Sequence, residues 1–99
     1  MQRGGAVYIM TNESNKVLYT GVTSNLVKRA YEHRTHAIGN GFSNMYNCTK
    51  LVWYKGFSRI EDAIAEEKRI KGGSRQQKID MINSINPEWK DLWEEIEKW

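Results

Sequence analysis

Apolar runs and turn formers divide the first half of the chain into short strand-like segments. Residues 6–10 are apolar and β-rich, residues 11–16 are a cluster of turn formers, and residues 17–22 are again β-rich. This succession predicts a β-hairpin, because two β-type runs separated by turn residues fold back on each other. Residues 50–57 predict a third strand by the same criteria.

The segment after the hairpin predicts a helix that Thr23 or Ser24 caps with its hydroxyl group. The expected apolar stripe of this helix consists of Leu26, Ala30 and Tyr31. Its other faces are expected to carry Lys28, Arg29, Glu32 and His33. Arg29 and His33 are four residues apart and therefore share one face of the helix.

A long loop and a second helix are predicted around the third strand. Residues 35–49 have no clear hydrophobic period and predict a surface loop that is a candidate substrate contact. Ser58 is expected to cap the next helix, with Glu61 completing a capping box. Gly72 and Gly73 are expected to end it. Its apolar positions are Ile60, Ala63, Ile64 and Ile70.

Two further helices are predicted in the C-terminal third. Ser74 is expected to cap the first, which runs to about Ser84 with Ile79 and Ile82 facing inward. Pro87 is expected to open the second, an acidic amphipathic helix that docks onto the core rather than onto a membrane or a partner. Its apolar residues are Trp89, Leu92, Trp93, Ile96 and Trp99. The predicted order β-β-α-β-α-α-α is an α+β fold, a small three-stranded antiparallel sheet flanked by helices.

Length and composition favour one domain over residues 1–99. In a chain of 99 residues with 39% hydrophobic content, two separate cores would each be near the lower size limit for unaided folding. The longest apolar run, residues 6–10, is far shorter than the about 20 residues of a membrane helix. The single Cys48 cannot form an internal disulfide, so we expect a buried thiol in the reducing cytoplasm.

The charge of the chain is uneven. Residues 1–59 hold eight Lys and Arg against two Asp and Glu, whereas residues 60–99 hold seven against ten. A basic front part is typical of proteins that meet phosphate groups, although a solvated cationic surface would have the same composition. Charge alone does not decide between a nucleic-acid partner and an ordinary surface.

Most compact catalytic motifs are missing from the sequence. It contains no phosphate-binding GxxxxGK[ST] loop, no HExxH zinc motif, no paired CxxC and no GxSxG elbow. What remains is a distributed set of residues suited to phosphate chemistry: Tyr8, Tyr19, Arg29, His33 and Glu67.

These residues make the sequence resemble the GIY-YIG nuclease superfamily, whose Gly-Ile-Tyr and Tyr-Ile-Gly triplets lie on adjacent strands. Here the triplets read Ala-Val-Tyr at 6–8 and Tyr-Thr-Gly at 19–21. Arg29 matches the arginine of the family and Glu67 its metal-binding glutamate. The resemblance covers nearly the whole chain. It is strongest to the small single-domain bacterial members, which are similar to the N-terminal nuclease domain of the bacterial excision-repair system.

The resemblance implies an endonuclease that uses Mg²⁺ or Mn²⁺ to hydrolyse phosphodiester bonds of DNA, with repair or processing as its setting and RNA left open. It implies Glu67 as the metal ligand, which suits Mg²⁺ because this ion keeps most of its waters. It implies Tyr8 as general base or water-positioning group and Tyr19 as a phosphate or water ligand. Arg29 would contact the phosphate through its planar fork, and His33 would orient water or hold phosphate.

Nucleic-acid contacts are expected from exposed basic and aromatic residues: Lys28, Arg34, Tyr46, Lys50 and Lys55. Neither a membrane nor an obligate protein partner is expected. Two other functions stay open at this point. One is a non-catalytic nucleic-acid-binding module of the same fold, motivated by Asn44 and Met45 where the family commonly has a lysine before Tyr46. The other is a scaffold that holds a partner with its tryptophan-rich C-terminus.

Overall fold

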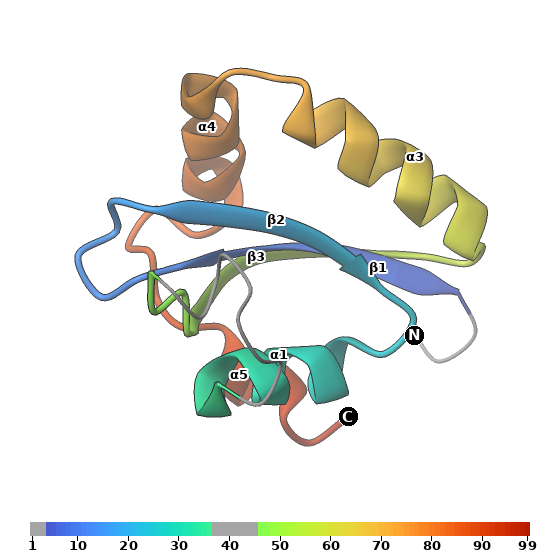
Figure 1. Cartoon of the computed structure of the whole chain (residues 1–99), viewed down its shortest axis with the longest axis horizontal. Coiled ribbons are helices and arrows are strands. Elements are labelled where there is room, and N and C mark those ends of the chain that lie inside the picture. Colours follow the sequence, from blue (N-terminus) through green and yellow to red (C-terminus); the bar gives the residue numbers. More distant parts are fainter. Residues whose placement is uncertain (1–3, 37–45) are drawn as a thin grey trace.

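The computed structural model describes residues 4–36 and 46–99, a three-stranded sheet with helices on both faces (Figure 1). The predicted α+β class and element order are confirmed. In the described part of the chain, no helix is long and apolar enough to cross a membrane. The elements are β1 (Gly5–Thr11), β2 (Leu18–Thr23), α1 (Leu26–Thr35), β3 (Lys50–Phe57), α3 (Ile60–Lys71), α4 (Arg75–Ile85) and α5 (Trp93–Ile96).

The sheet has the order β2-β1-β3, and both pairings of the central strand are antiparallel. Tyr8 on β1 lies opposite Gly21 on β2 and opposite Tyr54 on β3. The predicted third strand has the observed bounds, and the first two strands differ from prediction by one residue at their ends. Residues 37–45 of the predicted loop lie outside the described residues.

Alternation along β1 divides the core into two layers. Ala6, Tyr8 and Met10 pack with buried residues of α1 and α5, whereas Val7 and Ile9 pack with buried residues of α3 and α4. Figure 1 shows these two helix pairs on opposite faces of the sheet. Every residue of β1 is buried, because successive side chains of a strand point to opposite faces and both faces are covered.

The hairpin that carries both tyrosines is closed by side-chain hydrogen bonds. Asn12 Oδ1 accepts from the backbone N–H of Lys16 at 2.9 Å and of Val17 at 3.2 Å. Thr11 Oγ1 donates to the Val17 carbonyl at 2.7 Å. These short-range contacts hold β1 and β2 in register, as expected for turn residues with side-chain oxygens.

The start of α1 differs from prediction. Asn25, rather than Thr23 or Ser24, is the N-cap, and its side chain accepts from the Lys28 N–H at 3.1 Å. Thr23 is still part of β2, and its hydroxyl oxygen instead accepts from the Asn25 N–H at 3.0 Å. Because the strand continues through Thr23, the helix can begin only after the tight turn that this bond closes.

The predicted capping box of α3 is wrong. The chain stays extended through Arg59, with φ −126° and ψ 132°, so Ile60 is the first helical residue and no side chain caps the helix. Glu61 is then the second helical residue, one position too early to form a capping box with the N-cap.

The predicted cap of α4 is confirmed and is a full capping box. Ser74 Oγ accepts from the Gln77 N–H at 3.1 Å, and Gln77 Oε1 accepts from the Ser74 N–H at 2.9 Å. Ile82 of this helix is buried against the sheet, as its spacing predicts.

The predicted long helix from Pro87 is wrong, since α5 spans only Trp93–Ile96. Trp89 has φ 54°, a left-handed conformation that a right-handed helix cannot contain. The segment nevertheless docks onto the core as expected, with Leu92 8% exposed and Ile96 fully buried.

Side chains fasten the C-terminal segment to β3. The Asn86 amide donates to the Val52 carbonyl at 3.0 Å, and Asp91 Oδ1 accepts from the Leu51 N–H at 3.2 Å. The Leu92 N–H donates to the Leu51 carbonyl at 2.7 Å. The segment is therefore held by backbone groups of an edge strand that would otherwise lack partners there.

We predict that Asn86→Ala lowers the free energy of unfolding by about 2 kcal/mol or more, because it leaves the Val52 and Lys90 carbonyls without their amide donor. Urea denaturation followed by circular dichroism measures this change. Ser84→Ala is the control, since its exposed hydroxyl bonds only to the Met81 carbonyl and its loss should cost less than about 0.5 kcal/mol. Equal stabilities of the two variants would contradict the assigned role of Asn86.

Candidate active site

Tyr8 and His33 form a buried hydrogen bond between β1 and α1. Tyr8 Oη lies 3.0 Å from His33 Nε2, and the two residues are 1% and 2% exposed. The expectation that His33 lies on a polar face of the helix is wrong. Its imidazole turns inward because it is the partner of a buried phenol, and a buried hydroxyl without a hydrogen bond would be costly.

Tyr19 on β2 completes a cluster of three rings, the Tyr8–Tyr19–His33 cluster. Ring centroids are 6.3 Å apart for the two tyrosines, 5.5 Å for Tyr8 and His33, and 5.2 Å for Tyr19 and His33. The Tyr19 side chain is close enough to raise the pKa of Tyr8. The predicted pair of tyrosines thus meets on one face of the sheet, beneath α1.

Gly21 leaves the space that the Tyr8 ring occupies. A Cβ atom at residue 21 would lie 2.4 Å from Tyr8 Oη and 2.5 Å from Tyr8 Cζ, closer than atoms can approach. Because Gly21 lies directly opposite Tyr8 in the register, the phenol can lie flat across the neighbouring strand. The Tyr-Thr-Gly triplet is therefore explained by close packing of one tyrosine on this glycine.

Arg29 brings a positive charge to the edge of the cluster. Its side chain is 41% exposed, and its Nε lies 3.2 Å from Glu32 Oε1. Its charge also acts to lower the pKa of both Tyr8 and His33. Arg29 therefore pairs with Glu32 at the surface. Its charge also acts on the buried cluster, one helical turn before His33.

Burial keeps both Tyr8 and His33 neutral at physiological pH. Burial raises the pKa of Tyr8 well above its usual range, with Tyr19 adding to the rise and Arg29 opposing it. Burial, and then the charge of Arg29, lower the pKa of His33 to about 4. A neutral imidazole can accept a proton from the Tyr8 hydroxyl, so the pair can pass a proton without either group being charged at rest.

Glu67 lies outside this cluster. It belongs to α3, whose buried Ala63 and Ile70 pack on the sheet face opposite to that of Tyr8. Its side chain is 12% exposed, and its carboxylate pairs with Lys71 Nζ at 2.7 Å. The structure therefore brings four of the five predicted catalytic residues together and holds the fifth in the other helix layer.

Glu67 is the carboxylate that the resemblance assigns to a divalent metal. Within residues 4–36 and 46–99, no group of three or more His, Cys, Asp or Glu side chains could hold a metal ion. One carboxylate suits Mg²⁺, which is commonly held by one or two carboxylates together with waters and substrate phosphates. A metal on Glu67 would have to replace Lys71 as the partner of the carboxylate.

Of the predicted nucleic-acid contacts, Arg34 has an internal partner. Its guanidinium pairs with Asp91 and lies 5.2 Å from the centre of the Trp93 ring. Asp91 Oδ1 also accepts from the Trp93 N–H at 3.0 Å. Sequence reasoning missed this role of Asp91, because nothing in the local pattern links two residues that are 57 positions apart.

The other predicted contacts are spread over the surface. Lys28 is exposed on α1, and Tyr46 is 44% exposed. Lys50 begins β3, and Lys55 of the same strand lies over the ring of Phe57 at 5.2 Å. Lys28 and the two β3 lysines thus belong to different elements.

Comparison with known proteins identifies the class to which this geometry belongs. The family model described as GIY-YIG catalytic domain matches residues 4–80, which confirms the resemblance seen in the sequence. The chain belongs to the GIY-YIG family, whose catalytic domain suggests nuclease activity.

Curated relatives are small proteins of similar length. The chain is 35% identical over 82 residues to a UPF0213 protein of Syntrophus aciditrophicus, covering 83% of this chain and 92% of the relative. It is 32% identical to a UPF0213 protein of Clostridium perfringens, covering 91% and 95%. The solution NMR structure of a UPF0213 protein from Bacillus halodurans has the same fold, with TM-score 0.53, 22% identity, and coverage of 89% of this chain and 92% of that one. The name UPF0213 states no activity, so these relatives support the family and not a substrate.

We predict that Gly21→Ala lowers the free energy of unfolding by about 2 kcal/mol, since the new methyl group displaces the anchored Tyr8 ring. Urea denaturation measures the effect. Gly72→Ala is the matched control, because its Cβ would meet nothing closer than the Lys68 carbonyl oxygen at 3.5 Å. The control should change stability by less than about 1 kcal/mol. An unchanged Gly21→Ala variant would refute the close packing of Tyr8 on this glycine.

We predict that His33 makes folding stability fall between pH 6.5 and about 4. The pKa of His33 is about 4 in the folded chain against 6.5 for a free imidazole, so the unfolded state binds more protons in this window. Stability from this residue is fully present above pH 6.5 and decreases by about 3 kcal/mol as the pH falls to 4. Unfolding of the wild type and of His33→Gln at several pH values isolates this contribution. Identical pH dependence of the two proteins would show that His33 is not held neutral.

Proposed function

We propose that this protein is a divalent-metal-dependent endonuclease that hydrolyses phosphodiester bonds of DNA, in repair or processing within the cytoplasm. The observation that carries the proposal is the buried Tyr8–His33 hydrogen bond beside the half-exposed guanidinium of Arg29. A proton acceptor and an anion-binding group are the two things that a phosphate-cleaving site requires from its protein. Membership of the GIY-YIG family supports the same reaction.

Arg29 is the proposed phosphate-binding group. Its side chain is 41% exposed and its ion pair with Glu32 lies at the surface, where such pairs contribute little stability. A phosphate can therefore take the place of the Glu32 carboxylate at low cost. The planar guanidinium then offers parallel N–H groups to two non-bridging oxygens, where charge builds up as the bond breaks.

The proposed proton path runs inward through the phenols. Tyr8 is 1% exposed and Tyr19 is half-buried, so Tyr19 is the phenol that can meet a water molecule. Water gives a proton to Tyr19, Tyr19 passes its own to Tyr8, and Tyr8 passes its own to His33 Nε2. No free phenolate is needed, which agrees with the raised pKa of Tyr8.

Substrate binding would strengthen the final acceptor. The charge of Arg29 is one cause of the low pKa of His33. A phosphate anion on Arg29 offsets that charge, so the pKa of His33 rises when substrate is present. The imidazole then becomes a better base at the moment when a proton must be removed from water.

Glu67 is the proposed ligand of Mg²⁺ or Mn²⁺. The ion would supply positive charge to a departing oxygen only where the substrate strand reaches the α3 side of the sheet, since Glu67 belongs to the layer opposite to Tyr8. The exchange of Lys71 for a divalent ion keeps the half-buried carboxylate paired with a cation throughout. This chain contributes only the one carboxylate, and waters and phosphate oxygens would complete the coordination.

We predict that Glu67→Gln slows Mg²⁺-dependent nicking of supercoiled plasmid about 100-fold or more, because the amide cannot replace the anionic ligand. Glu66→Gln is the matched control, since this neighbouring residue pairs with Arg69 on the same helix and should nick at the wild-type rate. Arg29→Ala should be slowed about as strongly as Glu67→Gln. Wild-type rates for both Glu67→Gln and Arg29→Ala would contradict the proposed site.

A second candidate function is supported by the position of Glu67. Its ion pair with Lys71, in the helix layer opposite to Tyr8, would suit a module that binds nucleic acid without cutting it. Such a module would bind DNA in a salt-dependent way, unaffected by Mg²⁺ and by Glu67→Gln. The plasmid assay distinguishes the two candidates, because only the endonuclease converts supercoiled DNA to the nicked form.

A further inference from the structure

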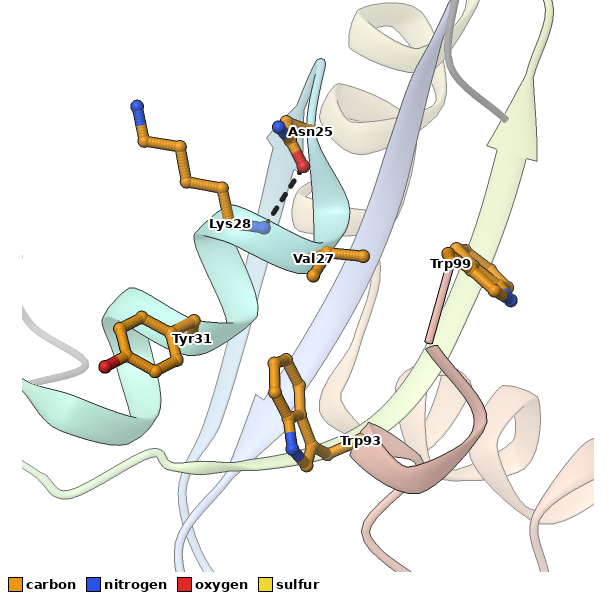
Figure 2. Close-up of a pocket in the computed structure, with 6 residues that line it drawn as sticks. All are labelled: Asn25, Val27, Lys28, Tyr31, Trp93 and Trp99. Atoms are coloured by element: carbon orange, nitrogen blue, oxygen red, sulfur yellow. Dashed lines mark hydrogen bonds between the residues drawn. The ribbon is translucent and has the colours of Figure 1, made fainter. Parts of the chain in front are cut away.

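A groove lies between α1 and the C-terminal segment (Figure 2). Its volume is about 370 Å³, which is within the range of small-molecule sites. The groove is lined by Asn25, Val27, Lys28, Tyr31, Trp93 and Trp99.

Three aromatic side chains line the groove: Tyr31, Trp93 and Trp99. Tyr31 and Trp93 have ring centroids 6.4 Å apart at an angle of 40°, and Trp99 packs edge-on against Tyr54 at 5.5 Å. Tyr31 is 56% exposed and Trp99 is 50% exposed. The sequence-based assignment of Tyr31 to the apolar stripe of its helix is therefore wrong, because the ring lies at the surface.

The rim of the groove is cationic on the α1 side. Lys28 extends away from the helix in Figure 2 and is in no ion pair with any described residue. Acidic residues of the C-terminal segment border the groove on its other side, since Trp93 lines both this groove and a second one. Glu95 accepts a hydrogen bond from Tyr54 at 3.0 Å, and Glu94 and Glu97 line a second groove together with Arg34 and Lys90.

The groove and Arg29 lie on different sides of the same helix. At 3.6 residues per turn, Arg29 is about 100° around α1 from Lys28 and about 160° from Val27 and Tyr31. A helix with its side chains is about 10 Å across, so the groove and the guanidinium are separated by about three stacked nucleotides at most. A strand whose phosphate lies on Arg29 would therefore pass around α1 and reach the groove with a base about three nucleotides away.

We infer that this groove binds an unpaired nucleobase of the substrate by stacking against Tyr31, Trp93 and Trp99, while Lys28 contacts the adjoining phosphate. The inference rests on the proposed function in taking nucleic acid as the ligand. Exposed aromatic rings beside a lysine are the combination by which proteins bind single strands without reading sequence. A base in a duplex is stacked on both sides and cannot enter, so the groove selects substrates with an unpaired stretch beside the cleaved bond.

The test measures binding of the full chain in EDTA, which separates it from cleavage. The probes are a fluorescent 12-nucleotide oligothymidylate, an abasic strand of the same length, and a blunt 12-base-pair duplex. We expect the wild type to prefer oligothymidylate over the other two. Tyr31→Ala and Trp99→Ala should each reduce that preference about 5- to 100-fold, the usual contribution of one stacked base.

Two further variants control for folding and for ring chemistry. Tyr31→Phe keeps an aromatic face and should retain the wild-type preference. Ile85→Ala removes an apolar residue that is 58% exposed on α4, far from the groove in the other layer, and should also retain it. Loss of preference in Ile85→Ala as well, or none in Tyr31→Ala and Trp99→Ala, would overturn the inference.

The outcomes also separate the inference from the proposed function. Preference for oligothymidylate that depends on Tyr31 and Trp99, in a protein that does not nick plasmid, would retain the groove and reject the endonuclease. Nicking together with equal affinity for oligothymidylate and abasic strand would retain the endonuclease and reject the groove. The latter result would leave the aromatic rings as a surface for some other partner.

Discussion

The hydrogen bond between Tyr8 and His33 is the interaction on which the site depends. Each group would cost about 1–3 kcal/mol if buried without a partner, and together they satisfy each other within an apolar layer. The bond requires Gly21, because any side chain at that residue would occupy the space of the phenol. It also requires α1 to dock with His33 inward. The same contacts therefore determine how the hairpin packs against the helix and which polar groups meet in the site.

The sheet separates the residues proposed for proton transfer from the residue proposed to bind metal. Successive residues of β1 point to opposite faces, so Tyr8 contacts α1 while Val7 and Ile9 contact the layer that contains Glu67. The proposed proton relay uses residues of one face only. If the proposal holds, proton transfer and metal binding are separable, and a chain that lost one would still keep the fold and the other.

Much of this arrangement follows from local sequence, and the rest does not. The strands and the meeting of Tyr8 with Tyr19 follow because turn residues fix the register of a short hairpin. The burial of His33 does not follow from local sequence. The helical pattern groups His33 with polar residues, and its partner Tyr8 is 25 positions away. The prediction of a long C-terminal helix fails for the same reason. Its apolar spacing is helical, but Trp89 is left-handed and Asp91 bonds to a distant strand.

Asp91 links three parts of the fold that lie far apart in the sequence. One carboxylate oxygen accepts from the Leu51 and Trp93 N–H groups, and the other pairs with Arg34 near the end of α1. A single side chain thus links β3, the C-terminal segment and α1. Because Trp93 is a wall of the groove opposite α1, the proposed base-binding site depends on this link. The tryptophan-rich segment is then both a cover for the core and part of the proposed surface for nucleic acid.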